Sequence, residues 1–180
     1  MGTESDETLV DRCRRGDAGA FRLLMVRYER ALYNAAYRVL GSVDDARDVT
    51  QTAFMQVAEG LDEYDPAHRF FSWIYRITLN AAHNLLRGNR RKEALAEQEP
   101  RPQPADPESR AVESELSFRI QKALMQLSED HRVALTLRHF SGCSYREISV
   151  ILGIEESTVK SRLFEARQRM RAALRDLERD

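Results

Sequence analysis

Apolar residues recur at steps of three and four along most of the chain, and this spacing places them on one face of successive α-helices. In the first half, the pattern predicts four helices, over about residues 5–15, 17–41, 42–61 and 69–88. Asp17 and Ser42 are residue types that cap helix N-termini, and Gly41 suits a C-terminal stop. Pro66 is tolerated at a first helical position, so the chain is expected to restart as helix near Asp65.

The second half shows the same periodicity, which predicts helices over about 116–127, 128–140, 144–152 and 156–176. No segment alternates apolar and polar residues as a half-buried strand does. The intervening sequence KEALAEQEPRPQPADPESRAVESE holds four of the five prolines and few large apolar residues, which is typical of a linker. We therefore expect an all-α fold of two helical domains, over 1–92 and 112–180, joined by a linker over 93–111.

Composition and charge exclude several classes of protein. The formal net charge is −1, so the chain as a whole is not drawn to nucleic acid electrostatically. The two cysteines, Cys13 and Cys143, are far apart, and the four histidines make no metal-ligand spacing with them. No apolar stretch is long enough to cross a bilayer, and the acidic N-terminus is unlike a signal peptide. A cytoplasmic protein without metal or membrane insertion is expected.

The sharpest motif is YREISVILGIEESTVKSRLFEARQRMR near the C-terminus. A helix-turn-helix needs a small residue at the helix crossing, a glycine in the turn and a β-branched residue on the second helix, and Ser149, Gly153 and Val159 occupy these places. Hydroxyl and basic side chains on the second helix can contact phosphates and base edges. The candidate DNA contacts are Ser157, Thr158, Lys160, Ser161, Arg162 and Arg167.

Charge is sorted sharply in the first half. Residues 42–65 contain seven acids against Arg47 alone, whereas residues 66–92 contain basic residues and no acid. Such sorting suits a protein that contacts both another protein and DNA. The basic window also holds aromatic residues, of which Phe70, Trp73 and some neighbours must be core. Aromatic rings among arginines can also stack on unpaired bases. Arginines and asparagines at helical spacing form a polar stripe of side chains that hydrogen-bond bases and phosphates.

With these motifs in this order, nearly the whole chain resembles the extracytoplasmic-function (group IV) sigma factors of the sigma-70 family. GDAGAFRLLMVRYERALYNAAYRVLG and DDARDVTQTAFMQVAEGLDEYD resemble the first part of the sigma-2 domain. FFSWIYRITLNAAHNLLR resembles its promoter-melting and −10-recognition part, and the helix-turn-helix segment resembles the sigma-4 domain, which reads the −35 element.

The resemblance implies a role for each set of residues. Recognition of the −10 element is implied for Arg69, Phe71, Arg76, Asn80, Asn84, Arg87, Arg90 and Arg91. Binding to core RNA polymerase is implied for Asp44, Asp45, Asp48, Gln51 and Phe54. The implied partners are the clamp helices of the largest polymerase subunit, the polymerase flap, promoter DNA and an anti-sigma factor. No cofactor and no catalytic residue is implied.

The sequence departs from the family pattern at three places. Arg47 and Thr52 stand where acids are usual, so polymerase binding is expected to be weaker or regulated, and a phosphate on Thr50 or Thr52 would restore negative charge. The loop YDPAHR lacks a glycine often found there, which leaves the −10 base preference open. Glu155 stands where serine is common, which leaves the −35 contacts open.

Two alternatives compete with this interpretation. A stand-alone helix-turn-helix regulator would share the C-terminal half but gives no reason for the charge sorting or for the aromatic cluster. An enzyme such as a nucleic-acid hydrolase would need clustered carboxylates or histidines around a metal or nucleophile. The acids between 44 and 65 have no such partners, so the sequence predicts a sigma factor that is not an enzyme.

Overall fold

The computed structural model describes residues 4–95 and 115–177, and every regular element in these two ranges is helical. The N-terminal half, residues 4–95, contains α1 (Asp6–Arg14), α2 (Ala18–Leu40), α3 (Val43–Gly60), the 3-10 turn η1 (Leu61–Glu63) and α4 (Phe70–Leu95). The C-terminal half, residues 115–177, contains α5 (Glu115–Met125), α6 (Glu129–Leu135), the π-helical turn η3 (Thr136–Phe140), α7 (Tyr145–Leu152) and α8 (Glu156–Asp176). The predicted all-α fold class is confirmed for these residues.

Local capping chemistry explains most helix limits in the N-terminal half. The Ser5 hydroxyl accepts a hydrogen bond from the Thr8 amide at the start of α1, and the Asp17 carboxylate accepts from the amides of Gly19 and Ala20 at the start of α2. These bonds satisfy amides that have no partner within the helix. Gly41 ends α2 with φ +76°, a left-handed conformation that glycine adopts without steric cost.

Two predicted helix limits are wrong. Residues 65–68 form a turn in which the Asp65 carboxylate accepts from the Ala67 amide, so Pro66 does not start a helix. Helix α4 begins at Phe70 and runs through Gly88 to Leu95. Residues 93–95 of the predicted linker therefore continue α4, and the remainder of that linker, 96–111, lies outside the described residues.

The core of the N-terminal half is built around aromatic side chains from three segments. Phe70 is 1% exposed, and its ring lies 5.6 Å from Tyr28, 5.6 Å from Tyr64 and 5.7 Å from Trp73, measured between centroids. Edge-on and tilted arrangements of this kind add to the free energy of burying the rings. The cluster fixes the start of α4 against α2 and against the segment that leads into α4.

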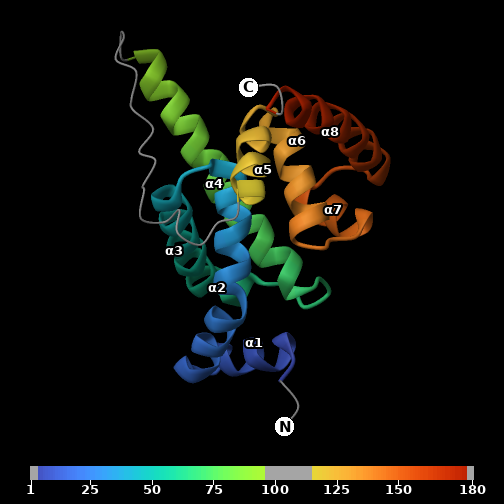
Figure 1. Cartoon of the computed structure of the whole chain (residues 1–180). Helices are drawn as coiled ribbons and strands as arrows, with labels where there is room; N and C mark the ends of the chain where they lie inside the picture. The colour runs from blue at the N-terminus through green and yellow to red at the C-terminus, as the bar shows by residue number, and fades with distance from the viewer. Residues whose placement is uncertain (1–3, 96–114, 178–180) are drawn as a thin grey trace.

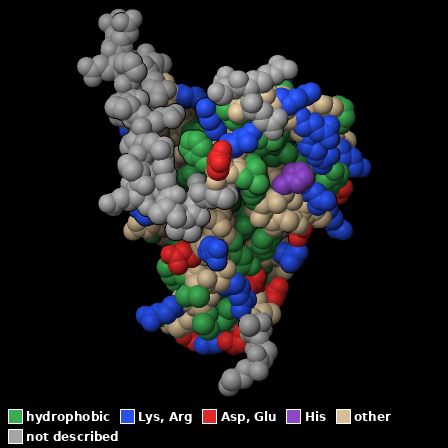
Figure 2. All heavy atoms as spheres, viewed as in Figure 1, with side chains coloured by type: hydrophobic (Ala, Val, Ile, Leu, Met, Phe, Trp, Pro, Cys, Tyr) green, Lys and Arg blue, Asp and Glu red, His purple; other side chains and the backbone are tan. Residues whose placement is uncertain are grey.

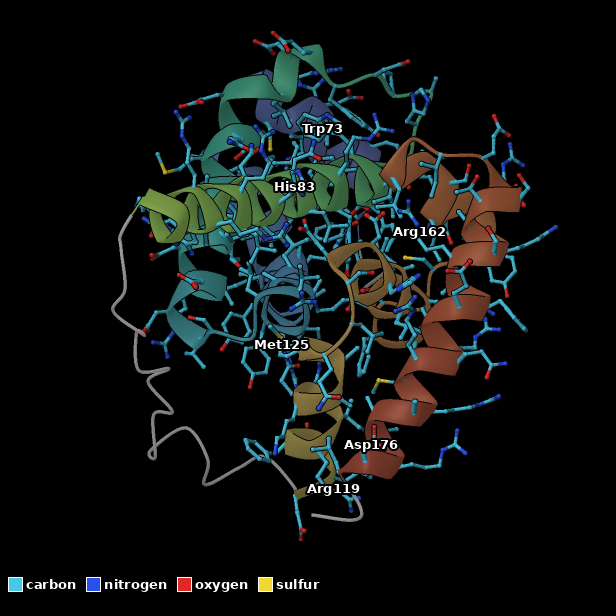
Figure 3. All side chains as sticks on the ribbon, turned by 90° about the horizontal axis from the view of Figure 1, so that it is seen from above. Trp73, His83, Arg119, Met125, Arg162 and Asp176 are labelled. Atoms are coloured by element: carbon cyan, nitrogen blue, oxygen red, sulfur yellow. The ribbon has the colours of Figure 1, made fainter. Side chains whose placement is uncertain are left out.

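The two halves pack against each other along α2 and α4. Helices α5 and α6 lie beside α2, and α7 lies beside the first part of α4 (Figure 1). Arg38 of α2 donates to the Gln121 side-chain oxygen at 3.0 Å and to the Ser117 hydroxyl at 3.2 Å, and its guanidinium lies 4.8 Å from the centre of the Phe140 ring. Met125 lies where α5 meets α2, close to Gly41 (Figure 3).

Candidate nucleic-acid interface

Helices α7 and α8 form the predicted helix-turn-helix. The Ser144 hydroxyl accepts from the Glu147 amide while the Glu147 carboxylate accepts from the Ser144 amide, so a complete capping box starts α7. At the crossing, the Ser149 hydroxyl donates to the Ile154 carbonyl at 2.6 Å, and Val159 is fully buried. The small residue and the β-branched residue thus occupy the positions that the sequence predicts.

Gly153 ends α7 with φ +64°, and no heavy atom lies within 4 Å of where a Cβ would stand. Gly153→Ala is therefore expected to lower the free energy of unfolding by about 1–2 kcal/mol through backbone strain alone. Gly88→Ala is the matched control, because Gly88 lies inside α4 with equally open surroundings. It is expected to raise stability by up to ~1 kcal/mol. Urea unfolding measures the change in the free energy of unfolding for both variants. Equal changes in the two variants would contradict the strain argument.

One exposed face of α8 forms what we call the recognition surface. It lies opposite the buried residues Val159, Leu163 and Ala166, and helical spacing defines its members. They are Ser157, Lys160, Ser161, Phe164, Gln168 and Arg171, all exposed. Lys and Arg side chains gather over α8 in the space-filling view (Figure 2). Thr158 is also exposed, at the edge of this surface.

Sequence reasoning missed Phe164, the most informative member of the recognition surface. Its side chain is 63% exposed although it is large and apolar. A bulky ring among exposed hydroxyl and basic side chains offers an apolar contact at the centre of this surface. Its place on the same helix face could have been predicted, because Phe164 follows Ser161 by three residues and Lys160 by four.

Two predicted DNA contacts lie off the recognition surface and bond to neighbouring helices. Arg162 pairs with Asp130 of α6 at 3.0 Å. Arg167 donates to the Tyr145 hydroxyl at 3.1 Å, and this hydrogen bond lowers the pKa of the phenol. Both arginines therefore hold α8 against its own domain, and their role as DNA contacts stays a prediction.

The polar side chains of α4 form a second surface, the α4 stripe. Helical spacing aligns Arg76, Asn80, His83, Asn84, Arg87, Arg90 and Arg91 on one face, and all seven are exposed. A hollow of about 410 Å³ lies beside the end of the helix, lined by Asn84, Arg87, Gly88, Arg90 and Arg91. His83 was missed by sequence reasoning, although it follows Asn80 by three residues.

The C-terminal half contacts one side of the α4 stripe. Arg76 donates to the Val150 carbonyl of α7. His83 and Arg90 both pair with the Glu129 carboxylate of α6, with Arg90 at 3.1 Å. Asn80, Asn84, Arg87 and Arg91 are exposed, and no hydrogen bond or ion pair joins them to residues 115–177.

The turn before α4 is held by an anchored tyrosine. Tyr64 is 3% exposed, its hydroxyl donates to the His68 carbonyl at 2.5 Å, and Arg14 donates to the carbonyls of Leu61 and Tyr64. Burial raises the pKa of the Tyr64 phenol. The predicted −10 residue Arg69 stands exposed at the end of this turn and pairs with Glu147 of α7.

The aromatic residues of the basic window divide between core and surface. Phe70 and Tyr75 are buried, whereas Phe71 and Trp73 are half-buried, and the Phe71 ring is tilted by 33° against Tyr75 with centroids 4.4 Å apart. The guanidinium of Arg69 lies 5.9 Å from the centre of the Phe71 ring. Phe71 is thus the aromatic residue of this group that keeps part of its ring accessible beside a cation.

A third surface is the α2–α3 groove, a hollow of about 690 Å³. Its lining from α2 is Phe21, Met25, Glu29, Arg30 and Tyr33, and its lining from α3 is Arg47, Thr50, Gln51, Phe54, Met55 and Ala58. Of the predicted polymerase contacts, Asp44, Asp48 and Gln51 are exposed along α3 beside it. Phe54 is only 6% exposed and forms part of the groove floor, and Asp45 is half-buried on another face of α3.

Thr50 is a poor site for phosphorylation in the folded protein. Its side chain is 6% exposed, and its hydroxyl donates to the Ala46 carbonyl at 2.7 Å. A kinase needs the hydroxyl free and accessible, so the folded structure does not favour a phosphate on Thr50, and the hypothesis is untested. Thr52 is exposed, and a phosphate there remains a hypothesis.

Among residues 4–95 and 115–177, no cluster of three or more His, Cys, Asp or Glu side chains could hold a metal ion. No described helix combines the length and the apolar character needed to cross a membrane. Cys143 is buried, and burial raises the pKa of its thiol to about 12.

Comparison with known proteins identifies the family to which this chain belongs. The family model for Sigma-70 region 2 matches residues 24–92, and that for Sigma-70, region 4 matches residues 117–170. The RNA polymerase sigma-H factor of Pseudomonas aeruginosa is 34% identical to this chain, and the match covers 98% of this chain and 97% of that protein. The chain belongs to the extracytoplasmic-function sigma factors of the sigma-70 family.

Other relatives agree with this membership of the sigma factor family. The ECF RNA polymerase sigma-E factor of Escherichia coli K12 is 33% identical over 91% of both chains. The solved complex of CnrH with the cytosolic domain of CnrY superposes with a TM-score of 0.75 at 26% identity, covering 96% of this chain and 99% of that chain. The sigma factor RpoE of Bartonella quintana, solved with the anti-sigma factor NepR, gives 0.70 at 26% identity over 86% and 96%.

The matches locate the three surfaces within this sigma factor. Region 2 spans most of α2, all of α3 and most of α4, and therefore contains both the α2–α3 groove and the α4 stripe. Region 4 spans α5 to most of α8 and contains nearly all of the recognition surface. Because sigma-factor relatives cover both halves, the alternative of a stand-alone helix-turn-helix regulator is not favoured.

Proposed function

We propose that this sigma factor divides promoter recognition and polymerase binding among its three surfaces. The recognition surface reads the −35 element, the α4 stripe with Arg69 and Phe71 binds the −10 element, and the α2–α3 groove with its flanking acids binds core RNA polymerase. The observation that carries this proposal is the presence of two separate basic surfaces on two helical halves of a chain whose net charge is −1. The protein acts in the cytoplasm and catalyses no reaction of its own.

At the −35 element, α8 would enter the major groove as the second helix of a helix-turn-helix does. Lys160 and Arg171 lie on the recognition surface and can contact phosphates or guanine edges, while Ser157 and Ser161 can contact phosphates. The exposed ring of Phe164 lies between them and suits apolar contact with a thymine methyl group. This set replaces Arg162 and Arg167 as the leading candidates for direct contact.

Lys160→Ala is expected to weaken binding of promoter DNA and to reduce the slope of log K against log salt by about 1, because one phosphate contact releases about one counterion. Fluorescence anisotropy with −35 duplex across a salt series measures this slope. Lys122→Ala is the matched control, because Lys122 is an exposed lysine of α5 that lies outside the recognition surface. An unchanged slope for Lys160→Ala would remove Lys160 from the interface.

At the −10 element, the α4 stripe offers asparagine amides flanked by guanidinium groups. Asparagine can hydrogen-bond base edges, and arginine can neutralise phosphates of a separated strand. Phe71 provides a partly accessible ring beside Arg69 at the end of the stripe, which suits stacking on an unpaired base.

At the polymerase, the α2–α3 groove offers a largely apolar floor, with Arg30 and Arg47 in its lining and exposed acids on α3. Phe54 and Met55 line the groove, and Asp44 and Asp48 are exposed along α3 beside it. A helical partner with basic and apolar side chains is complementary to such a surface. The clamp helices of the largest subunit are the proposed occupant of this groove, and the flap is the proposed partner of the C-terminal half.

An anti-sigma factor is a further proposed partner. CnrH was solved with the cytosolic domain of CnrY, and the sigma factor RpoE with the anti-sigma factor NepR. The superposition on CnrH covers 96% of this chain and so includes both halves. The arrangement of the halves in this protein therefore resembles the arrangement in a sigma factor that holds such a partner.

Run-off transcription with purified core polymerase tests the proposed function directly. Promoter-containing DNA from the same genome is transcribed with and without the protein. Initiation at discrete start sites only in its presence is the expected result. If the protein binds DNA but neither joins the core nor changes the start sites, the stand-alone regulator replaces the sigma factor as the account of its function.

A further inference from the structure

Two carboxylates of the C-terminal half pair with side chains of the proposed −10 surface. Glu129 of α6 pairs with His83 and Arg90, and Glu147 of α7 pairs with Arg69. These pairs bracket the contact between α7 and α4, since Arg76 donates to the Val150 carbonyl between them. Arg69 of the turn before α4, and His83 and Arg90 of the α4 stripe, thus face acids of the other half.

Burial is uneven across these ion pairs. The side chains of Glu129 and Glu147 are 14% and 23% exposed, whereas those of Arg69 and Arg90 are 72% and 62% exposed. The Ser144 backbone amide and hydroxyl, together with Arg69, lower the pKa of Glu147. Glu147 is therefore held in place by Ser144 of its own half, while both arginines keep open sides from which a competing anion can approach.

A DNA phosphate competes for the same groups that these carboxylates hold. Arginine forms charge-assisted hydrogen bonds of similar geometry with carboxylate and with phosphate. The Phe71 ring, whose centre lies 5.9 Å from the Arg69 guanidinium, offers a stacking contact to a base of the same DNA strand. A single strand that follows the α4 stripe would have to displace Glu129 and Glu147.

The packed arrangement also cannot reach both promoter elements at once. Positions −35 and −10 are about 25 base pairs apart, which is about 85 Å of duplex at ~3.4 Å per base pair. In this structure Arg76 of α4 donates to the Val150 carbonyl of α7, the helix that leads directly into α8. The two halves must separate before each can occupy its own element.

The contact between the halves is held by hydrogen bonds and by ion pairs that reach the surface. Arg38 of α2 donates to the Gln121 side-chain oxygen across it, and the arginines paired with Glu129 and Glu147 are largely exposed. Exposed ion pairs contribute little to stability, so breaking them costs little free energy.

We propose that Glu129 and Glu147 form an acidic latch that holds the C-terminal half over the α4 stripe and competes with the −10 strand for Arg69, His83 and Arg90. This inference rests on the proposed function, because it assumes that the α4 stripe binds the −10 element. The latch lowers the affinity of the free protein for promoter DNA until the halves separate.

The test compares two double variants with equal changes in charge. Glu129→Gln/Glu147→Gln removes both latch charges, and glutamine at 147 still completes the capping box. Asp130→Asn/Glu165→Gln removes two acids whose partners, Arg162 and His131, belong to the same half. The probe is a short fluorescein-labelled single strand from the −10 region of a promoter mapped by run-off transcription, with a scrambled strand beside it.

The latch variant is expected to bind the −10 strand about tenfold more tightly, and a fluorescence donor and acceptor on the two halves are expected to show a larger separation. The control variant should match the wild type in both measurements. Raised salt should separate the halves of the wild type but not those of the latch variant, because exposed ion pairs are screened. Thermal melting monitored by circular dichroism verifies that both variants fold.

Equal gains in the two variants, or no change in the latch variant, would overturn the latch. Run-off transcription keeps this outcome distinct from failure of the proposed function. If the wild type and the latch variant initiate at the same start sites while their −10 affinities are equal, the sigma function stands and the latch does not. If neither yields discrete start sites, the proposed function itself is wrong.

Discussion

Met55→Glu is expected to abolish promoter-specific initiation while leaving the protein folded. Met55 is 57% exposed and lines the α2–α3 groove, so a carboxylate there meets water in the free protein and harms the fold little. In the proposed complex, Met55 meets the apolar side chains of the polymerase helix, so a carboxylate at this position loses its water without gaining a partner. Burying an unpaired charge at the centre of an interface costs several kcal/mol, which corresponds to at least a hundredfold loss of affinity.

Affinity for core polymerase is measured by competition against a labelled sigma factor, and initiation by run-off transcription. Val26→Glu is the matched control, because Val26 is a 71% exposed apolar residue of α2 that does not line the groove. It adds the same charge to the same half and should leave polymerase binding near the wild-type level. Normal binding by Met55→Glu would place the polymerase on another surface.

Phe70→Ala is expected to lower the free energy of unfolding by about 3–5 kcal/mol. The ring is 1% exposed and touches three other aromatic rings from α2, α4 and the segment before α4. Its removal leaves a cavity that a rigid aromatic cluster fills poorly. Because native proteins are stable by only about 5–15 kcal/mol, the melting temperature should fall by roughly 10 °C or more.

Phe164→Ala makes the same chemical change at an exposed site. Its ring is 63% exposed on the recognition surface, so the free energy of unfolding should change by less than about 0.5 kcal/mol. Calorimetry of the two variants measures how much stability the same Phe→Ala change removes at a buried and at an exposed position. Phe164→Ala should nevertheless bind the −35 element less tightly than the wild type does. A large loss of stability in Phe164→Ala would mean that its ring belongs to the core.

Features set by local chemistry could be predicted from the sequence. Asp17 and Ser42 cap helices as expected because a side-chain oxygen satisfies amides only a few residues away. The helix-turn-helix followed from Ser149, Gly153 and Val159, since its geometry depends on small, flexible and β-branched residues at fixed spacing. The apolar periodicity likewise located α8 over the same residues, 156–176, that the structure shows.

Features that depend on distant contacts could not be predicted. Gly88 has low helix propensity, yet α4 continues through it for seven more residues because neighbouring turns tolerate one glycine. Nothing in the spacing of Arg162 shows that Asp130, far along the chain, would take its guanidinium. The same holds for Glu129 and Glu147, whose partners lie in the other half. Apolar periodicity shows on which face of a helix a residue lies, but not which residues of other helices contact that face.

Glu147 uses its two carboxylate oxygens for different purposes. Oε2 accepts from the amide and hydroxyl of Ser144, and Oε1 accepts from Arg69. Separation of the halves therefore frees one oxygen and leaves the start of α7 intact. Under the latch proposal, the helix-turn-helix would move as a rigid body without refolding, and motions of this kind take microseconds to milliseconds. Opening of the latch would then add no folding step to the search for a promoter.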